Sequence, residues 1–311
     1  MRPHSLAWGL VFASALAVPA HADGLSLTAN FDDGKRIASC SDIDIRFWKD
    51  KLGADDIVTS RRDQTVALRA DSLTPLKVKA SDRGGIRVQP SSDGSLSATV
   101  CMAAGARSDD AARAILDKLS VESDRGELRV SGPDAEEWAA YIILNVPSDV
   151  ALELSAVNGC LSLLDVSGHF NLRTTNGPIS LVGVGGEVDA EAVNGPVHFK
   201  GHSGDIRLVT QNGPVGVSLD QPTWTGKGLE ASAQNGPVKV VVPTGVRSGV
   251  QVEGSAHSPV RWNGSAEPGL TEDGGSRSFR FGEGPILVHV STVNGPIEIK
   301  APRRSSLGKT I

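Results

Sequence analysis

The feature that most constrains this chain is an Asn-Gly dipeptide that recurs at a fixed interval through its C-terminal half. The first three intervals are 18 residues each, and Pro follows the dipeptide in five of the seven copies. A second glycine column stands ten residues into the unit, at Gly168, Gly186 and Gly204. Such self-similarity predicts a repeat fold in which each unit stacks on the next. The repeated asparagines are Asn158, Asn176, Asn194, Asn212, Asn235, Asn263 and Asn294.

Within a unit, apolar and polar residues alternate. After Asn176, for example, Ile179 and Leu181 flank Ser180, and the second half of the unit repeats the pattern. A period of two is typical of a half-buried strand. Each unit therefore predicts two short strands and two turns.

Asn-Gly pairs also occur in β-hairpins, which would give an antiparallel meander. A meander does not need an identity every 18 residues, whereas stacked coils place the same residue type at the same phase. We therefore expect an all-β fold, a parallel β-solenoid with 18-residue coils whose neighbouring strands lie about 4.8 Å apart. Asn and Gly are expected to supply positive φ at the turns. The structural turn residues are Asn158, Asn176, Asn194, Asn212, Asn235 and Asn294.

The period breaks after the fourth copy. The next interval is 23 residues, and between residues 243 and 284 the register is unclear, which predicts a long loop or irregular coils. The last regular coil, 291–301, would leave Ile297 and Ile299 as an apolar end covered only by the basic tail, 302–311. End-to-end self-association through that end is one expectation.

The N-terminal half is less regular. We expect residues 23–75 to form a cap that protects the open edge of a solenoid domain over residues 76–301. Ser108 predicts the start of one short helix that runs to Leu119, with acidic residues in its first turn. Strands are expected at residues 42–48, 76–80, 85–89, 95–102 and 127–130.

Residues 1–22 have the layout of a secretory signal peptide. A short basic start precedes the apolar run from Leu6 to Val18, and Ala20-His21-Ala22 forms a cleavage site. An uncleaved anchor is the alternative, but a run of about 13 residues is short for a bilayer that needs about 20. Asp23 after the cut, in place of Cys, argues against a lipid anchor. We expect an exported protein of the periplasm or cell exterior, without a membrane span after cleavage.

The charge balance argues against nucleic acid as a partner. Without the first 22 residues, 30 Lys and Arg stand against 36 Asp and Glu, a net charge of −6. Nucleic-acid binding requires a strongly basic surface. The basic tail is expected to be a solvated chain end.

The chain has three cysteines, and an exported compartment permits disulfides. Cys40 and Cys101 both lie in the irregular N-terminal half beside predicted strands, so we expect them to pair. Closing that loop stabilises the fold by roughly 4 kcal/mol on the chain-entropy model. Cys160 would remain as a structural thiol on a repeat turn.

One polar column could carry catalysis. His169, Glu187 and Asp205 share one phase of the repeat, and two carboxylates about 5 Å apart would match a retaining glycosidase. The alternative is that residues after a turn glycine simply face solvent, and no aromatic sugar platform stands nearby. We favour the second interpretation and expect no catalytic residue and no enzyme activity.

The candidate metal sites are weak. His198 and His202 are four apart, but on a strand and a turn they need not converge. The run from Gly183 to Asp189 is similar to the calcium-binding nonapeptide, yet neighbouring units do not repeat it. We therefore expect no metal and no cofactor.

Trp224 and Trp262 stand where the repeat is interrupted. Insertions on repeat proteins often form the binding face, so both are candidates for partner contact. The alternative is that each fills the local core.

The run from Ile142 to Pro147, the strand that ends in Val157-Asn158-Gly159 and the closing Asn294-Gly295-Pro296 resemble the bacterial exported "putative adhesin" domain of unknown function. The resemblance covers roughly residues 76–301; the cysteine-containing N-terminal segment and residues 243–284 depart from it. It implies a β-solenoid of exported and envelope proteins, without established catalytic residues.

Together these features predict a non-catalytic exported β-solenoid, an adhesin or envelope-associated binding or scaffold module. Its partner would be an envelope component or polymer that the sequence does not identify. Two alternatives stay open: a polysaccharide-active hydrolase or lyase, and a self-assembling structural element.

Overall fold

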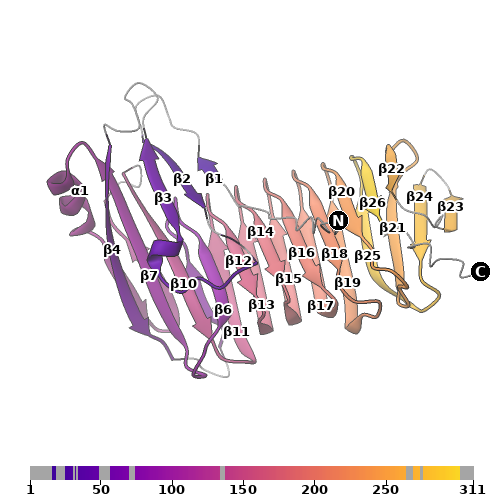
Figure 1. The fold of residues 1–311 in the computed structure, drawn as a ribbon, viewed down its shortest axis with the longest axis horizontal. Coiled ribbons are helices and arrows are strands. Elements are labelled where there is room, and N and C mark those ends of the chain that lie inside the picture. Colours follow the sequence, from indigo (N-terminus) through magenta and orange to yellow (C-terminus); the bar gives the residue numbers. More distant parts are fainter. Residues whose placement is uncertain are drawn as a thin grey trace, which may run out of the picture.

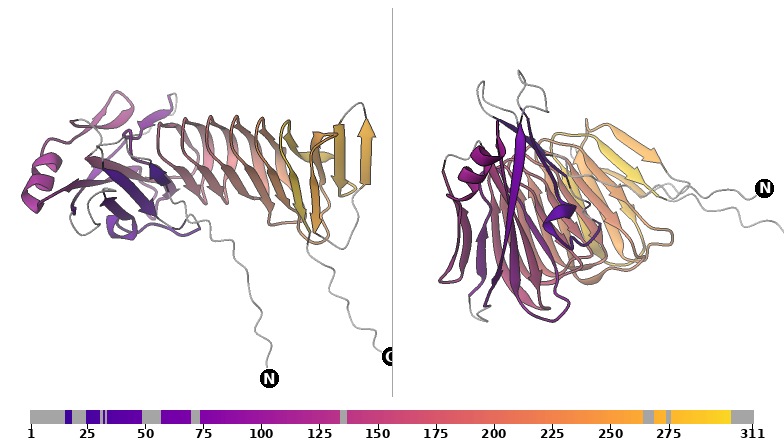
Figure 2. Two further views of the ribbon diagram at one scale, coloured as in Figure 1. Left: turned by 90° about the horizontal axis from the view of Figure 1, so that it is seen from above. Right: turned by 60° about the vertical axis from the view of Figure 1, so that its left-hand side comes forward.

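The computed structural model describes residues 16–18, 25–30, 32, 34–48, 57–69, 74–133, 137–263, 269–273 and 276–301. The fold is nearly all β, with one α-helix among the described residues (Figure 1). Two large sheets carry most of the strands, and a small three-stranded sheet lies near the N-terminal end. Figure 2 shows the large sheets as a long row of strands stacked side by side.

The first large sheet, called sheet I here, has 11 strands. Its strands are parallel from β22 through β10, and the last two pairs, β10–β7 and β7–β4, are antiparallel. In spatial order they are β22 (Val260–Asn263), β26 (Ile297–Lys300), β20 (Val238–Val241), β18 (Val215–Leu219), β16 (Val197–Gly201), β14 (Ile179–Val182), β12 (Leu161–Leu164), β6 (Ile86–Pro90), β10 (Trp138–Val146), β7 (Ser97–Ala106) and β4 (Val58–Ala67).

Sheet II has 12 strands and is parallel from β21 through β9. Antiparallel strands close both of its ends. In spatial order they are β23 (Gly269–Asp273), β24 (Ser276–Phe281), β21 (Gly249–Ser255), β25 (Ile286–Thr292), β19 (Thr225–Ala233), β17 (Ser203–Thr210), β15 (Gly185–Ala192), β13 (Ser167–Thr174), β11 (Val150–Ala156), β5 (Leu76–Lys79), β9 (Glu127–Ser131) and β8 (Ser120–Asp124).

In the regular part of both sheets, each residue pairs with the residue 18 positions further along the chain. Ile179 of β14 lies between Leu161 and Val197, and Glu187 of β15 lies between His169 and Asp205. The parallel pairing agrees with the expected stacking of units and is incompatible with a meander of hairpins.

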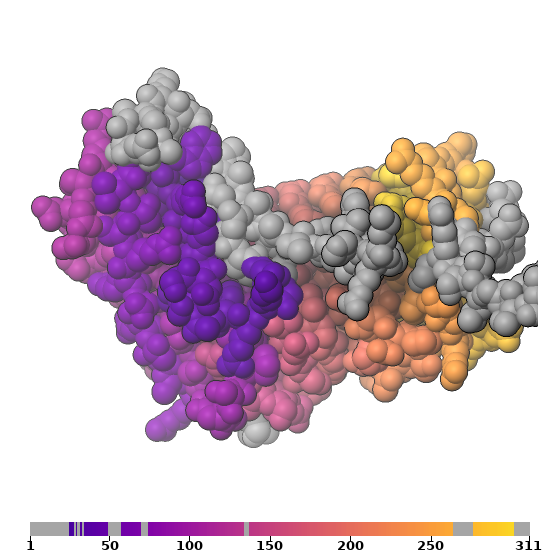
Figure 3. Space-filling view, in the orientation of Figure 1, coloured from indigo at the N-terminus to yellow at the C-terminus, as the bar shows by residue number. Residues whose placement is uncertain are grey.

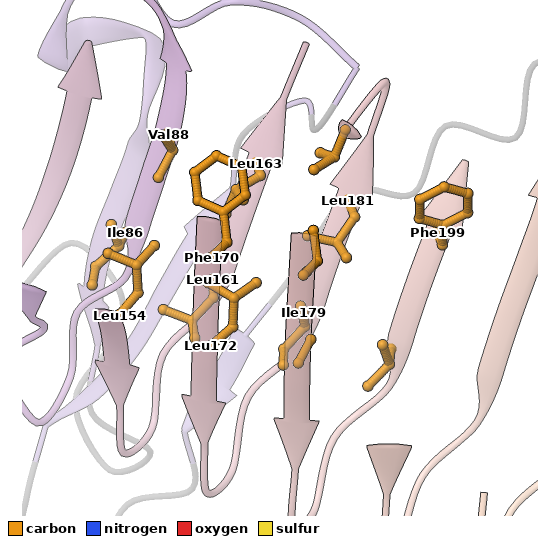
Figure 4. Close-up of a cluster of buried hydrophobic side chains, with 14 of the residues drawn as sticks. Ile86, Val88, Leu154, Leu161, Leu163, Phe170, Leu172, Ile179, Leu181 and Phe199 are labelled. Atoms are coloured by element: carbon orange, nitrogen blue, oxygen red, sulfur yellow. The ribbon is translucent and has the colours of Figure 1, made fainter. Parts of the chain in front are cut away.

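The core lies between the two sheets, where inward side chains from both form continuous columns (Figure 4). Leu161, Leu163, Ile179 and Leu181 of sheet I are 0% exposed, and Leu172 of sheet II is equally buried. The apolar columns predicted from the alternating pattern are therefore inward. A short strand of sheet I adds only two inward apolar side chains to the core, such as Leu161 and Leu163 of β12. The core is therefore thin, in keeping with a chain that is 4% aromatic.

The Asn-Gly-Pro turns follow a different rule from the expected one. None of the six asparagines or their glycines has a positive φ; the non-glycine residues that do are Arg125, Asp149 and Asp165 among those described. At the Asn-Gly-Pro turns, glycine is required for a different reason: successive turns approach each other too closely for a Cβ. A Cβ at Gly195 would lie 2.0 Å from the carbonyl oxygen of Gly177.

The asparagines of these turns form a side-chain ladder. Each amide Nδ2 donates to the Oδ1 of the preceding turn, at 2.9 Å from Asn176 to Asn158 and likewise from Asn194 to Asn176. The ladder continues without a break through Asn212, Asn235 and Asn294 at 2.9–3.1 Å. The last hydrogen bond joins Asn294 to Asn235, which are 59 residues apart in the sequence.

Residues 243–284 are not a long loop: their described parts contain β21, β22, β23 and β24. β22 pairs with β26, which leaves Ile297 and Ile299 fully buried. The expectation that these two residues form the exposed end of the stack is therefore wrong. The end strands are β22 in sheet I and β23 in sheet II.

The N-terminal segment lies on a face of sheet I (Figures 1 and 3). It contains β2 (Ser26–Asn30), β3 (Asp44–Trp48) and a 3₁₀ turn (Cys40–Asp42). Its apolar side chains pack on the outer side of β7 and β10. β4, which also lies within residues 23–75, forms the edge of sheet I, and the helix α1 (Asp109–Leu116) packs against it.

Several local predictions are confirmed. Cys40 and Cys101 form a disulfide with a Cα–Cα distance of 5.4 Å, and Cys160 is a buried thiol outside it. Ser108 caps α1 by accepting a hydrogen bond from the Ala111 amide. Each of the five strands expected in the N-terminal half is present within a few residues of its predicted bounds.

The predicted signal peptide lies mostly outside the described residues. Its residues Leu16–Val18 form the strand β1, which pairs antiparallel with β2. Cleavage after Ala22 would remove β1 and leave β2 at the edge of the small sheet. The tail 302–311 also lies outside the described residues, and the domain boundary at residue 75 stays a prediction.

The close approach of the turns can be tested with Gly195→Ala. The added methyl would overlap backbone atoms of Gly177, which cannot move without disturbing the adjacent strands. We expect the free energy of unfolding to fall by about 2 kcal/mol or more, measured by urea denaturation followed by circular dichroism. Gly185→Ala is the control, since its Cβ would meet only side-chain atoms of Ser203 and Ser167, at 3.3 Å or more. Equal losses in both variants would contradict this explanation.

Candidate functional site

A long hollow runs along the turns that lead from sheet I strands into sheet II strands. Its volume is about 960 Å³. At least three residues from each of four successive turns line it, together with others that include Pro90, Pro147, Asp149 and Asp165. The four triplets are Ser167-Gly168-His169, Gly185-Gly186-Glu187, Ser203-Gly204-Asp205 and Thr225-Gly226-Lys227.

The second glycine column lets these turns stack. Gly186, Gly204 and Gly226 have φ values of +82°, +114° and +117°, a region that favours glycine. A Cβ at Gly186 would also lie 2.2 Å from the carbonyl oxygen of Gly168. The floor of the hollow is therefore backbone and small side chains, with the charged column along it.

The charged column is arranged as two ion pairs. His169 Nδ1 lies 3.3 Å from Glu187 Oε2, and Lys227 Nζ lies 2.9 Å from Asp205 Oδ2. The hydrogen bond to Asp205 and its charge raise the pKa of Lys227. The column predicted from the sequence is thus brought together, and it has a fourth member.

Sequence analysis missed Lys227 because the longer interval after Asn212 hides its phase. Aligning the triplets Ser-Gly-X and Thr-Gly-X would have placed it after Asp205. The structure pairs Ser203 with Thr225 and shifts register directly after, so that Lys227 reaches Asp205.

Glu187 and Asp205 occupy paired positions on neighbouring strands, as the glycosidase hypothesis requires. Lys227 pairs with Asp205, and the His169 imidazole lies beside Glu187; 66% of the Glu187 side chain and 46% of the Asp205 side chain are exposed. A glycosidase acid is typically set in an enclosed, apolar environment. This geometry favours contact with a ligand over acid–base catalysis.

A second charged group lies on the outer face of sheet II. Asp189 accepts hydrogen bonds from Arg173 at 2.8 Å and from Arg207 at 3.0 Å, and Arg173 also lies 3.4 Å from Glu191. Burial opposes the ionisation of Asp189, but the two arginines more than offset it and hold its pKa below the ordinary value of 3.8. A hollow of about 380 Å³ adjoins Arg173 and Glu191.

The two tryptophans differ in accessibility. Trp224 is 5% exposed, its indole donates to the Gly204 carbonyl at 3.2 Å, and its ring centroid lies 5.7 Å from that of Phe199. Trp224 therefore fills the core and is not accessible to a partner, so its prediction as a partner contact is wrong. Trp262 is partly exposed and stacks on Phe281 with centroids 5.4 Å apart, which leaves its partner contact a prediction.

The remaining histidines do not converge. His202 Nδ1 lies 2.8 Å from Asp220 Oδ1, whereas His198 projects from β16. In the described part of the chain, no group of three or more His, Cys, Asp or Glu side chains could hold a metal ion. Nor does any helix there have the length and apolar content to cross a membrane.

No family model and no curated protein matches the chain. Similar solved structures include a "putative cell adhesion protein" from Clostridium sporogenes, with 12% identity over 78% of this chain and 100% of that chain and a TM-score of 0.31. A "putative adhesin" from Bacteroides fragilis has 12% identity over 78% and 97% of the two chains and a TM-score of 0.39. A "putative lipid binding protein" from Parabacteroides distasonis has 9% identity over 77% and 96% and a TM-score of 0.36.

Solved structures named as adhesins thus stand among those similar to this chain, as the sequence resemblance predicted. At such low TM-scores the likeness carries no weight for mechanism. The site is therefore interpreted from its own geometry.

The different roles of the tryptophans predict different effects on stability. Trp224→Ala should lower the free energy of unfolding by about 3–5 kcal/mol, because it empties a buried site. Trp262→Ala should cost clearly less, since part of its ring already contacts solvent. Chemical denaturation of both variants measures the difference, and a smaller loss in Trp224→Ala would contradict the assignment.

The arginine contacts of Asp189 predict a pH dependence. Its folded pKa lies below the unfolded one, so its contribution to stability is present above about pH 4 and is lost as the pH falls through the folded pKa. Asp189→Asn should lower the free energy of unfolding at pH 7 by less than about 1 kcal/mol, since the group is partly exposed.

That difference from the wild-type protein should shrink below the pKa, as urea midpoints at pH 7 and in acid would measure. Asp63→Asn, an exposed residue of β4, is the control. A pH-independent difference in Asp189→Asn would sink the assignment.

Proposed function

We propose that the chain is an exported, non-catalytic binding module of the cell envelope with an adhesin-like role. In this proposal residues 76–301 form a parallel β-solenoid with 18-residue coils. The parallel pairings 18 residues apart in both sheets support it. The Cys40–Cys101 disulfide supports an oxidising, exported location.

The observation that carries the proposal is the open charged column of the long hollow. Its polar side chains follow one another along the stack at the surface, with Glu187 beside His169 and Asp205 paired with Lys227. Such a surface can contact successive units of an extended ligand along its length. It lacks the enclosure that a small substrate would need.

Two alternatives follow from specific observations. The register pairing of Glu187 with Asp205 keeps a polysaccharide hydrolase or lyase as the second candidate. The edge strand β22 keeps end-to-end self-association as the third, now at a different place from Ile297 and Ile299. Sedimentation of the purified protein over a range of concentrations would distinguish the third alternative.

The test of the main proposal combines binding and turnover. The purified protein, without its signal peptide, should be retained by isolated cell-envelope material and should release neither reducing ends nor unsaturated uronates from polysaccharides. Product formation that is abolished by Glu187→Gln, but kept by Glu230→Gln on the outer face of β19, would show an enzyme instead. Failure of the wild-type protein to bind any envelope fraction would reject the proposal itself.

A further inference from the structure

The outer face of sheet I carries an unbalanced positive charge at its C-terminal end. This cationic face is formed by the outward residues of β16, β18, β20, β26 and β22. They include four Lys or Arg residues and one acid, Glu298, in a chain whose net charge is −5. The four cations are Lys200, Lys239, Lys300 and Arg261, with His198 beside them.

The outward direction of these residues follows from the burial of their neighbours. Val238 and Val240 on β20 are 0% exposed, as are Ile297 and Ile299 on β26. The residues between and after them therefore project from the other side of the sheet. Lys200 and Arg261 are exposed, and Lys239 and Lys300 are partly exposed.

Lys239 and Arg261 flank the one acid of the face, Glu298, on its two neighbouring strands. β20 and β26 are neighbours with Lys239 opposite Glu298, but Glu298 forms its ion pair with Lys300 at 3.0 Å. Burial lowers the pKa of Lys239, and the charge of Lys300 lowers it further. One acid among four cations leaves the face with net positive charge, which an anion bound over it would offset.

In the charged column of the long hollow, by contrast, acids and basic side chains are equal in number: His169 lies beside Glu187, and Lys227 pairs with Asp205. Asp220, the acid at the end of β18, lies against His202. The cationic face thus differs from the long hollow in having excess charge of one sign.

We propose that this face binds an anionic polysaccharide, an inference that rests on the proposed envelope-binding function and names its partner. Charge complementarity specifies an anion, and the spread of the cations specifies a polymer. The five strands span about 19 Å at 4.8 Å per strand, too long for one small anion to contact throughout.

The composition of the face favours a glycan over other polyanions. None of its outward residues is Phe, Tyr or Trp, whereas single-stranded nucleic acids are bound largely by base stacking on aromatic side chains. Val241 is its only outward apolar residue among those of the five strands, so it offers little to insert into a lipid surface.

The experiment compares two full-length triple variants of equal charge. Lys200→Gln, Lys239→Gln and Lys300→Gln together remove three cations from the face. Lys77→Gln, Lys79→Gln and Lys118→Gln remove three from elsewhere and serve as the control. The probes are polygalacturonate and, as an uncharged polysaccharide, dextran, with affinity measured at low and at physiological salt.

We expect wild-type protein and control to bind polygalacturonate but not dextran, and the face variant to bind about tenfold more weakly, with a smaller salt dependence. Unchanged thermal unfolding would show that the variant is folded. Equal losses in both triple variants, or wild-type binding only to single-stranded DNA or to anionic vesicles, would overturn the assignment.

Envelope retention separates this inference from the proposed function. If the wild-type protein is retained by envelope material but does not bind polygalacturonate, the inference fails and the binding function stands. If it binds polygalacturonate but no envelope fraction, the binding function fails as stated.

Discussion

The fold depends on how closely successive units approach at their glycine corners. At the Asn-Gly-Pro turn each glycine Cα lies against the carbonyl of the glycine before it, with no room for a Cβ. The same holds in the second glycine column, as at Gly186 over Gly168. Two fixed corners per unit hold both sheets in one register. In the regular part, equivalent side chains therefore repeat at the spacing of neighbouring strands.

That register explains which side chains can form columns. Asparagine can stack on itself because its amide has both a donor and an acceptor, which is how six of them form one ladder. Ionic side chains can alternate in sign, as Arg173, Asp189 and Arg207 do, although the carboxylates Glu187 and Asp205 are direct neighbours. The cationic face differs from these columns in its net charge, since its four cations stand with one acid, Glu298.

The sequence predicted the regular part of the fold well because periodicity reports burial directly. Leu161, Ile179 and Val197 could be assigned to one inward column from spacing alone, and the structure places them there. Spacing could not predict why glycine stands at the corner, since positive φ and close approach favour the same residue. Nor could it place Lys227, whose phase is displaced by the longer interval.

Where the period is lost, non-local contacts decide the structure. Nothing in the sequence of residues 243–284 indicates that β26, although later in the chain, lies between β20 and β22 in sheet I. From the sequence, Trp224 could be a surface residue or a core residue. The structure decides, because the Trp224 ring packs against Phe199 and its indole donates to the Gly204 carbonyl. The charged column of the hollow was predictable in part, because three of its members keep the 18-residue phase.

The N-terminal segment shows how a polar face can still be covered. The outer side of β6 presents Arg87 and Gln89, which are 2% and 1% exposed. Gln89 accepts from the Ile37 amide and donates to its carbonyl, and Arg87 donates to the Lys35 carbonyl. The backbone groups of Lys35 and Ile37 have no strand partner in sheet I, and these hydrogen bonds satisfy them. Polar groups can be buried only when they are hydrogen-bonded in this way.

Hydrogen bonds of this type contribute only about 1 kcal/mol each, net of those lost to water. The apolar cluster beneath the segment is small compared with the core between the sheets. The Cys40–Cys101 disulfide therefore has a definite place in the fold: it fastens the covering segment to β7, one strand from Tyr141 on β10. The disulfide belongs to this face alone, because Cys101 lies in the smaller cluster and not in the core between the sheets.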